Sequence, residues 1–190
     1  NVPSYLHATD VTVEVEGLGP LTVDIAYGGN FYAVVEPQQN WPGLSVGAAQ
    51  IISLSQRLRR ALAELDEPVH PEDASIRGVH HAIWCDAPQG EADGRGAVFY
   101  GEQAIDRSPG GTGTSARMAQ LFGRGRLAVG DRYRNESLIG TVFDGLVEEE
   151  VAIGPFAGIR PSLGAWARVI GHNTIFVDDR DPLCRGFQIS

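Results

Sequence analysis

A chain of 190 residues is long enough for one domain or two small lobes, and its 43% hydrophobic and 21% charged residues are ordinary for a globular protein. The net charge of −9 argues against nucleic acid or an anionic membrane as partner, because both bind clustered lysine and arginine. No apolar run approaches the roughly 18 residues that span a bilayer. We therefore expect a cytoplasmic protein that binds neither nucleic acid nor membrane.

The two ends of the chain and its cysteines give further expectations. The given sequence does not open with a basic and then apolar leader, so we expect no signal peptide, and NVPSYL is typical of the interior of a longer chain. Cys85 and Cys184 have no metal-ligand spacing. We expect two reduced thiols, with one disulfide as the alternative.

The first third of the chain predicts three strands and a helix. Alternating valines in TDVTVEVE, a Gly-Leu-Gly-Pro turn and LTVDIAYGG predict a hairpin over 9–27, and FYAVVE predicts a strand over 31–36. A helix should follow, with Ser45 as its cap and apolar residues at helical spacing as far as Leu65. Residues 67–74 are expected to form a Pro-rich acidic loop.

The rest of the chain predicts more strands and one more helix. GVHHAIWC (78–85) and GAVFYG (96–101) predict strands, a helix is expected over 112–122, and strands with turns are expected from 131 to 176. The apolar side chains of this second helix should face a core; they are Met118, Leu121 and Phe122. These elements indicate an α+β fold dominated by strands.

The most unusual segment is a Pro- and Gly-rich loop that opens into the second helix, DRSPGGTG (106–113). Successive backbone N–H groups in such a loop, together with the helix dipole, can hold a small carboxylate without an arginine. The segment is neither a P-loop nor a dinucleotide-binding fingerprint, because no Gly-Lys-Ser/Thr and no suitably placed acid follow it. A plain turn before a helix is the alternative.

The run DRSPGGTGTSARMAQLFGRGRL resembles the second active-site motif of the proline racemase family, which includes hydroxyproline epimerases and trans-3-hydroxy-L-proline dehydratases. Three more stretches resemble that family in order along the chain, while residues 66–96 match it least closely. These stretches are DIAYGGNFYAVV (24–35), ESLIGTVFDGLV (136–147) and GAWARVIGHNTIFVDDRDPLCRGF (164–187).

The resemblance implies a diaminopimelate-epimerase-like fold with two lobes, each a β-barrel-like sheet wrapped around a central helix. The active site would lie between the lobes, where each lobe supplies one acid/base residue, usually cysteine, and no metal, pyridoxal phosphate or other cofactor takes part. Residues 1–190 would be the C-terminal lobe, with final strands that can return to the N-terminal lobe. The Met-Cys-Gly-His-like motif of that N-terminal lobe is absent here, so the lobe is an expected partner; whether copies form a homodimer stays open.

Gly110 stands where the resemblance implies cysteine, or threonine in the dehydratase branch. Glycine has no titratable group, so a two-base racemisation lacks one acid/base residue, whereas elimination of a β-hydroxyl needs a base on one face only. Gly110 therefore favours dehydration of trans-3-hydroxy-L-proline. A 4-hydroxyproline 2-epimerase or proline racemase is the alternative, and a lobe that only binds a small carboxylate is a further one.

The resemblance also assigns substrate contacts within the loop. Asp106 would pair with the ring nitrogen of proline or a hydroxyproline, and Gly111 and Thr112 would give backbone N–H groups to its carboxylate. An Asx turn at Asp106 and a plain turn at the two other residues are the alternatives.

Two residues outside the loop are weaker candidates. Strand alternation points one of His80 and His81 inward. The resemblance loosely implies that His81 is the inward one and contacts a ring hydroxyl, with a structural histidine as the alternative. Tyr100 would line the pocket or else belong to the core.

Overall fold

The computed structural model describes residues 1–41 and 43–186. Within them, nine strands join into one sheet in the order β6-β3-β2-β1-β11-β10-β9-β7-β8, and pairing of β6 with β7 closes eight of the nine into a barrel. The strands are β1 Ser4–Val15, β2 Gly19–Tyr27, β3 Phe31–Val35, β6 Val79–Asp86, β7 Gly94–Tyr100, β8 Ala104–Ile105, β9 Arg132–Ser137, β10 Val142–Ile153 and β11 Phe156–Gly164. The barrel and the helix inside it confirm the α+β prediction.

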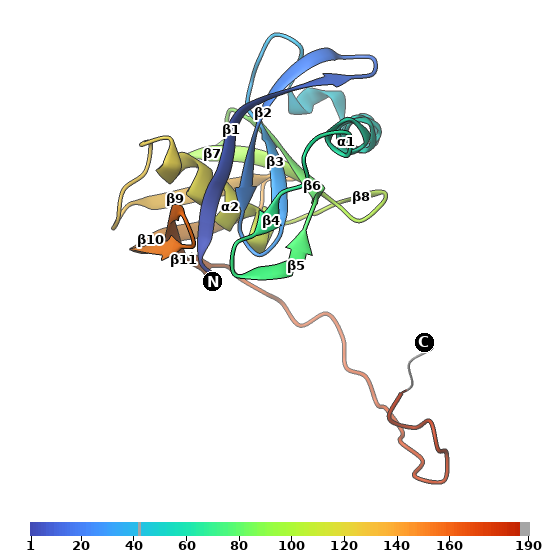
Figure 1. Ribbon diagram of the computed structural model, residues 1–190. Coiled ribbons are helices and arrows are strands. Elements are labelled where there is room, and N and C mark those ends of the chain that lie inside the picture. The colour runs from blue at the N-terminus through green and yellow to red at the C-terminus, as the bar shows by residue number, and fades with distance from the viewer. Residues whose placement is uncertain (42, 187–190) are drawn as a thin grey trace.

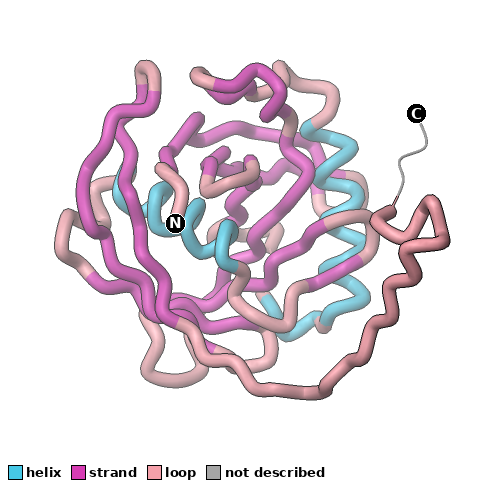
Figure 2. Tube along the Cα trace, turned by 90° about the horizontal axis from the view of Figure 1, so that it is seen from below, coloured by secondary structure: helices cyan, strands magenta, loops and turns pink. Residues whose placement is uncertain are grey.

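The helix α2 (Gly111–Gly123) runs through the inside of the barrel, as Figure 2 shows from below. Its residues from Gly113 to Leu121 are all buried. Met118 and Leu121 pack against one side of the barrel, while Ala116 packs against the opposite side. The predicted buried helix is therefore confirmed, although Phe122 is only partly buried.

The helix α1 (Ala48–Leu62) lies outside the barrel (Figure 1). Its apolar face packs on the outer surface of the sheet, where Trp84 donates from Nε1 to Ser55 Oγ at 2.7 Å. The predicted cap is wrong, because Ser45 belongs to the short 3₁₀ helix η1 (Leu44–Val46) and α1 begins after Gly47. Glycine at φ 83° redirects the chain there, and no side chain caps the helix.

Two other predicted boundaries differ. Leu65 lies beyond the end of α1 and is largely exposed. The predicted loop 67–74 contains most of a small hairpin of β4 (Val69–His70) and β5 (Asp73–Arg77). The ring of His70 packs on Tyr5 and Tyr27 of the barrel, a tertiary contact that residue spacing does not reveal.

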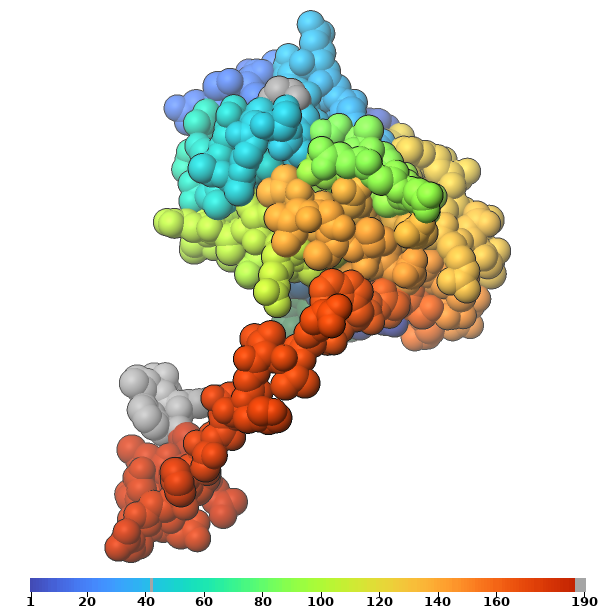
Figure 3. Space-filling model, turned by 180° about the vertical axis from the view of Figure 1, so that it is seen from behind, coloured from blue at the N-terminus to red at the C-terminus, as the bar shows by residue number. Residues whose placement is uncertain are grey.

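Residues 165–186 form no helix or strand and extend away from the barrel (Figures 1 and 3). The prediction of strands up to residue 176 is therefore wrong beyond Gly164. The physical reason is that β11 already pairs with β1 on one side and β10 on the other. A further strand would therefore find no free strand edge beside β11 to pair with. Phe187, the last residue of the run that resembles the family, lies outside the described residues.

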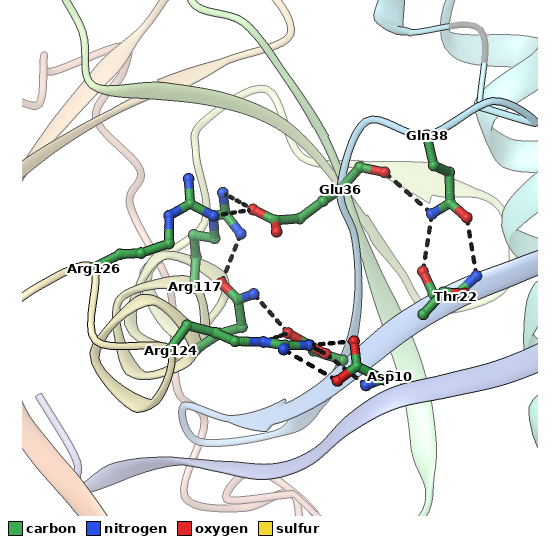
Figure 4. Close-up of polar contacts among 9 residues, drawn as sticks. Asp10, Thr22, Glu36, Gln38, Arg117, Arg124 and Arg126 are labelled. Carbon is green, nitrogen blue, oxygen red and sulfur yellow. Dashed lines mark hydrogen bonds and ion pairs between the residues drawn. The ribbon is translucent and has the colours of Figure 1, made fainter.

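A chain of polar side chains holds the C-terminal end of α2 against the barrel (Figure 4). Arg124 donates to Asp10 and Asp24. The side chain of Gln120 donates to Asp24 and accepts from Arg117, each at 2.7 Å. Burial raises the pKa of Asp24, but hydrogen bonds from Arg124 and Gln120 outweigh it, so that pKa lies below its ordinary value. We call this group the α2 clamp; its members are Asp10, Asp24, Glu36, Arg117, Gln120, Arg124 and Arg126.

Both cysteines are free thiols, with Cys85 buried, which agrees with the expected reduced state. No helix within residues 1–41 and 43–186 is long and apolar enough to cross a membrane.

Candidate active site

The loop 106–110 is fixed to the barrel on two sides before α2 begins. The N–H of Asp106 donates to the carbonyl of Val98 in β7 at 2.9 Å. On the other side, the hydroxyl of Thr141, in the turn between β9 and β10, donates to the carbonyl of Arg107 at 3.0 Å. The loop backbone therefore has a defined path, and the first turn of α2 emerges from it in a fixed direction.

Asp106 forms the Asx turn that the sequence offered as an alternative. Its Oδ1 accepts hydrogen bonds from the N–H and the hydroxyl of Ser108, at 2.8 and 2.9 Å. The hydroxyl oxygen of Ser108 in turn accepts the N–H of Gly110 at 3.1 Å. No hydrogen bond within the described residues reaches Oδ2 of Asp106. The turn thus leaves one carboxylate oxygen for a cationic ligand group.

The first turn of α2 has free backbone donors. The first hydrogen bond of the helix runs from Thr114 N–H to the carbonyl of Gly110, at 2.8 Å. Among the described residues, no acceptor is bonded to the N–H groups of Gly111, Thr112 and Gly113. Such N–H groups at the positive end of the helix dipole favour an anion. A turn bonded within itself would leave no such donors; the carboxylate site itself stays a prediction.

Thr112 is held by the turn between β2 and β3. Its Oγ1 lies 2.7 Å from the hydroxyl oxygen of Tyr32. A Cβ at Gly29 would lie 2.7 Å from the Thr112 methyl, and a Cβ at Gly28 would lie 2.3 Å from the Thr112 carbonyl oxygen. Only glycines allow this turn to approach α2 so closely. Sequence reasoning missed Tyr32, Gly28 and Gly29 as site residues; their one signal was the family-like stretch 24–35.

His81 lies beside Tyr32 on the inner face of the barrel. The two residues are opposite each other in the parallel pairing of β3 with β6, and their ring centroids are 5.2 Å apart. Burial, reinforced by the charges of His80 and Arg59, lowers the pKa of His81, which favours its neutral form. Nδ1 is buried without a partner, which leaves Nε2 as the nitrogen that can reach a ligand.

Tyr100 takes a different position from the other predicted site residues. It ends β7 and is 46% exposed, so the interpretation as a core aromatic is wrong. It follows Val98 by two residues and therefore shares its face of the strand. Within the described part of the chain, no hydrogen bond or ring contact joins Tyr100 to His81, Asp106 or Thr112. Its contribution to the site stays a prediction.

Gly110 has a backbone conformation that favours glycine, with φ 74° and ψ 126°. A Cβ built on it would lie 3.3 Å from the Cγ2 atom of Val98, so a side chain would point towards β7. A Cβ on Gly111 would meet no atom within 4 Å. In this backbone, the open side of the loop is therefore reached from position 111 and not from position 110.

The described cavities lie away from this loop. A cavity of about 750 Å³ lies between the C-terminal part of α1 and the sheet, lined by His7, Leu62 and His80 among others. A second, of about 230 Å³, lies beside Arg124. Neither is lined by residues 106–113, and Gly111 is exposed. The α2 N-terminus therefore opens onto the surface of this chain and not into either cavity.

Comparisons with known proteins bear on this arrangement. Residues 1–188 match the family model described as proline racemase. The chain is 71% identical to 4-hydroxyproline 2-epimerase 2 of Rhizobium rhizogenes and 51% identical to the 4-hydroxyproline 2-epimerase of Ancylobacter novellus. Each match covers 100% of this chain, and 58% and 57% of the two relatives.

Two solved structures share the fold. A probable proline racemase from Agrobacterium radiobacter K84 with bound carbonate has a TM-score of 0.85 and 31% identity, covering 99% of this chain and 55% of that one. A hydroxyproline epimerase from Agrobacterium vitis with bound trans-4-hydroxy-L-proline has a TM-score of 0.84 and 30% identity, covering 99% and 54%. The chain thus spans little more than half the length of these relatives. With residues 1–188 matched, it belongs to the proline racemase family.

Proposed function

We propose that the full-length protein binds 4-hydroxyproline at the α2 N-terminus and interconverts its two C2 epimers. The observation that carries the proposal is the set of unbonded N–H groups at Gly111, Thr112 and Gly113, which suits a carboxylate. The free Oδ2 of Asp106 suits the secondary ammonium of the ring. The neutral imidazole of His81 suits a ring hydroxyl. The names of the relatives from Rhizobium rhizogenes and Ancylobacter novellus favour this substrate over proline and over trans-3-hydroxy-L-proline.

The chemistry requires proton transfer on both faces of C2. A base removes the C2 proton, the electron pair delocalises onto the carboxylate, and a proton returns on the opposite face. The family resemblance assigns one of these transfers to position 110, where this chain has glycine. Because Gly110 offers no acid, water has to deliver that proton, and we expect a slower epimerisation than a two-cysteine site achieves.

Dehydration of trans-3-hydroxy-L-proline is the second candidate, and Gly110 is the observation that favours it. In this reaction the C2–H bond breaks, its electron pair forms the C2–C3 double bond, and the C3 hydroxyl leaves with a proton as water. The resulting enamine tautomerises to a cyclic imine. Only one base is needed, so the loss of a side chain at position 110 matters less.

The rest of the full-length protein would complete the site as the N-terminal lobe, with the first acid/base residue facing 111–113. Residues 165–186 would pack on that lobe, because several large apolar side chains there are exposed in this chain: Trp166, Val169, Ile170, Ile175, Phe176 and Val177. In the full-length protein, the emission lost on Trp166→Phe should be blue-shifted relative to free tryptophan; this difference excludes the emission of the buried Trp41 and Trp84. Emission typical of water-exposed tryptophan would overturn this packing.

The test is a substrate panel for the full-length protein in D₂O. Chiral chromatography follows trans-4-hydroxy-L-proline and L-proline, and a cyclic-imine assay follows trans-3-hydroxy-L-proline. We expect deuterium at C2 and the C2 epimer of 4-hydroxyproline, at a higher rate than proline racemisation. Imine as the main product would favour the second candidate, and binding without turnover would favour a lobe that only recognises carboxylates. The proposed function would be refuted if the protein neither bound nor turned over any of the three compounds.

A further inference from the structure

We infer that Tyr32 is a positioning residue of this site: it orients the hydroxyl of Thr112 towards the ligand carboxylate and supports the ring of His81. The inference rests on the proposed function and deepens it, because it explains how the two ends of one ligand are held at a fixed spacing. Tyr32 is not among the site residues that the sequence suggested.

The first argument is the direction of the hydrogen bond between Tyr32 and Thr112. Tyr32 is 3% exposed, and within the described residues Thr112 Oγ1 is the one partner of its hydroxyl. A buried hydroxyl has to use its proton, and a phenol is a stronger acid than an aliphatic alcohol. The two hydroxyl oxygens lie 2.7 Å apart, a contact in which either could donate, and we infer from the acidity of the phenol that Tyr32 donates and Thr112 accepts.

This direction leaves the proton of the Thr112 hydroxyl for another acceptor. No such acceptor is bonded to it within residues 1–41 and 43–186. The Thr112 methyl lies close to Gly29, where an added Cβ would come within 2.7 Å of it, which limits the rotation of the side chain. The hydroxyl sits on the same residue as one of the free N–H groups, where an incoming carboxylate supplies two acceptor oxygens. Donation from Tyr32 also strengthens Thr112 as a donor.

The second argument is the contact between Tyr32 and His81. Parallel pairing of β3 with β6 places the two residues side by side, with the rings tilted by 32°. Tyr32 thus touches Thr112 through its hydroxyl and His81 through its ring. One side chain sets the distance between the carboxylate donor and the imidazole that we assign to the ring hydroxyl.

The main test is Tyr32→Phe in the full-length protein, which removes the hydroxyl and keeps the ring. We expect KM to rise about three- to tenfold, as for one lost hydrogen bond. The rise should be equal for trans-4-hydroxy-L-proline and L-proline, with kcat unchanged and the melting temperature lowered only slightly, as for one lost hydrogen bond. Tyr27→Phe, on the same hairpin but in the outer cluster, is the matched control and should change none of these quantities.

Two more variants separate positioning from packing. Thr112→Val should raise KM by itself but add little in the Tyr32→Phe background, because both changes remove the same interaction. Tyr32→Leu should also lower the preference for 4-hydroxyproline over proline, because His81 loses its ring support. If Tyr32→Leu does not fold, the double-mutant cycle of Tyr32→Phe and Thr112→Val still tests whether Tyr32 acts through Thr112.

The outcomes distinguish this inference from the proposed function. If the wild type binds neither proline nor 4-hydroxyproline, the proposed function fails and the inference fails with it. If the wild type binds and Thr112→Val weakens binding while Tyr32→Phe does not, the inference alone is wrong. A parallel fall in melting temperature and kcat for Tyr32→Phe would show a purely structural role and also overturn it.

Discussion

The two ends of α2 differ in how their backbone groups are satisfied. At the N-terminal end, Gly111 and Gly113 flank Thr112, and no side chain within the described residues takes the first N–H groups. At the C-terminal end, Arg117 and Gln120 are buried in the α2 clamp, and the carbonyl of Gln120 accepts the N–H of Arg124 at 3.0 Å.

This difference shows how a buried helix can present unbonded N–H groups at one end. Free N–H groups at a helix end cost stability unless water or a ligand reaches them. The clamp and the apolar contacts of Met118 hold the middle and the C-terminal end of α2 in the barrel. The open end is then available to a ligand without any change in the fold.

The largest effect on stability should come from inserting a side chain between α2 and the β2–β3 turn. In Gly28→Ala the new methyl would lie 2.3 Å from both the Thr112 carbonyl oxygen and the Ala116 nitrogen. Because both atoms belong to the backbone, we expect a loss of about 3 kcal/mol or more in the free energy of unfolding. Urea denaturation measures it. Gly90→Ala, which meets nothing within 4 Å, is the control, and equal stability of the two variants would show that the turn does not press on α2.

Introducing a thiol at position 110 should change chemistry more than stability once the loop turns the new side chain away from Val98. For Gly110→Cys we expect the rate of 4-hydroxyproline epimerisation to rise by about 100-fold, the lower end of the rate gain that a general acid or base contributes. The loop has to leave φ 74° to accept a side chain, so some stability is lost. Gly110→Ser imposes the same strain without a thiol. An equal gain for serine, or no gain for cysteine, would contradict the role assigned to this position.

Breaking the clamp should affect stability and leave ligand binding intact. Asp24→Asn removes the charge that Arg124 pairs with, and we expect a loss of about 1–3 kcal/mol, reduced because Arg124 is partly exposed. The folded-state pKa of Asp24 lies below its ordinary 3.8, so its stabilisation is present above that pH and is lost as the pH falls further. The variant should therefore lose less stability in acid than the wild type. A raised KM for 4-hydroxyproline would show that the two ends are not independent.

The sequence predicted α2 and its loop well because the signal was local. Proline and glycines precede a helical pattern within 106–122, and the family resemblance is strongest there. Tyr32 was missed because its contact with Thr112 joins residues 80 positions apart. The cap at Ser45 was wrong because Asp86, far along the chain, holds the Leu44 N–H in a tight turn instead.

The strands predicted beyond Gly164 failed for a related reason. Apolar residues there, such as Val169, Ile170 and Ile175, suit a strand, but strand formation needs a neighbour, and β11 has both of its sides occupied. Gly110 was recognised from the resemblance alone. Its positive φ, and the direction that a side chain would take towards Val98, became visible only with the backbone in place.

The central claim is that the first-turn N–H groups of α2 bind the carboxylate of a proline derivative. The most direct test is amide NMR of the ¹⁵N-labelled full-length protein during titration with trans-4-hydroxy-L-proline, compared with 3-hydroxypyrrolidine, which lacks the carboxylate. We predict that hydroxyproline shifts the amide signals of Gly111, Thr112 and Gly113 most, leaves those of Arg124 and Gly125 in place, and that 3-hydroxypyrrolidine shifts none of them. Binding of hydroxyproline that leaves the first three signals unmoved, or equal shifts with the ligand that lacks a carboxylate, would contradict the account.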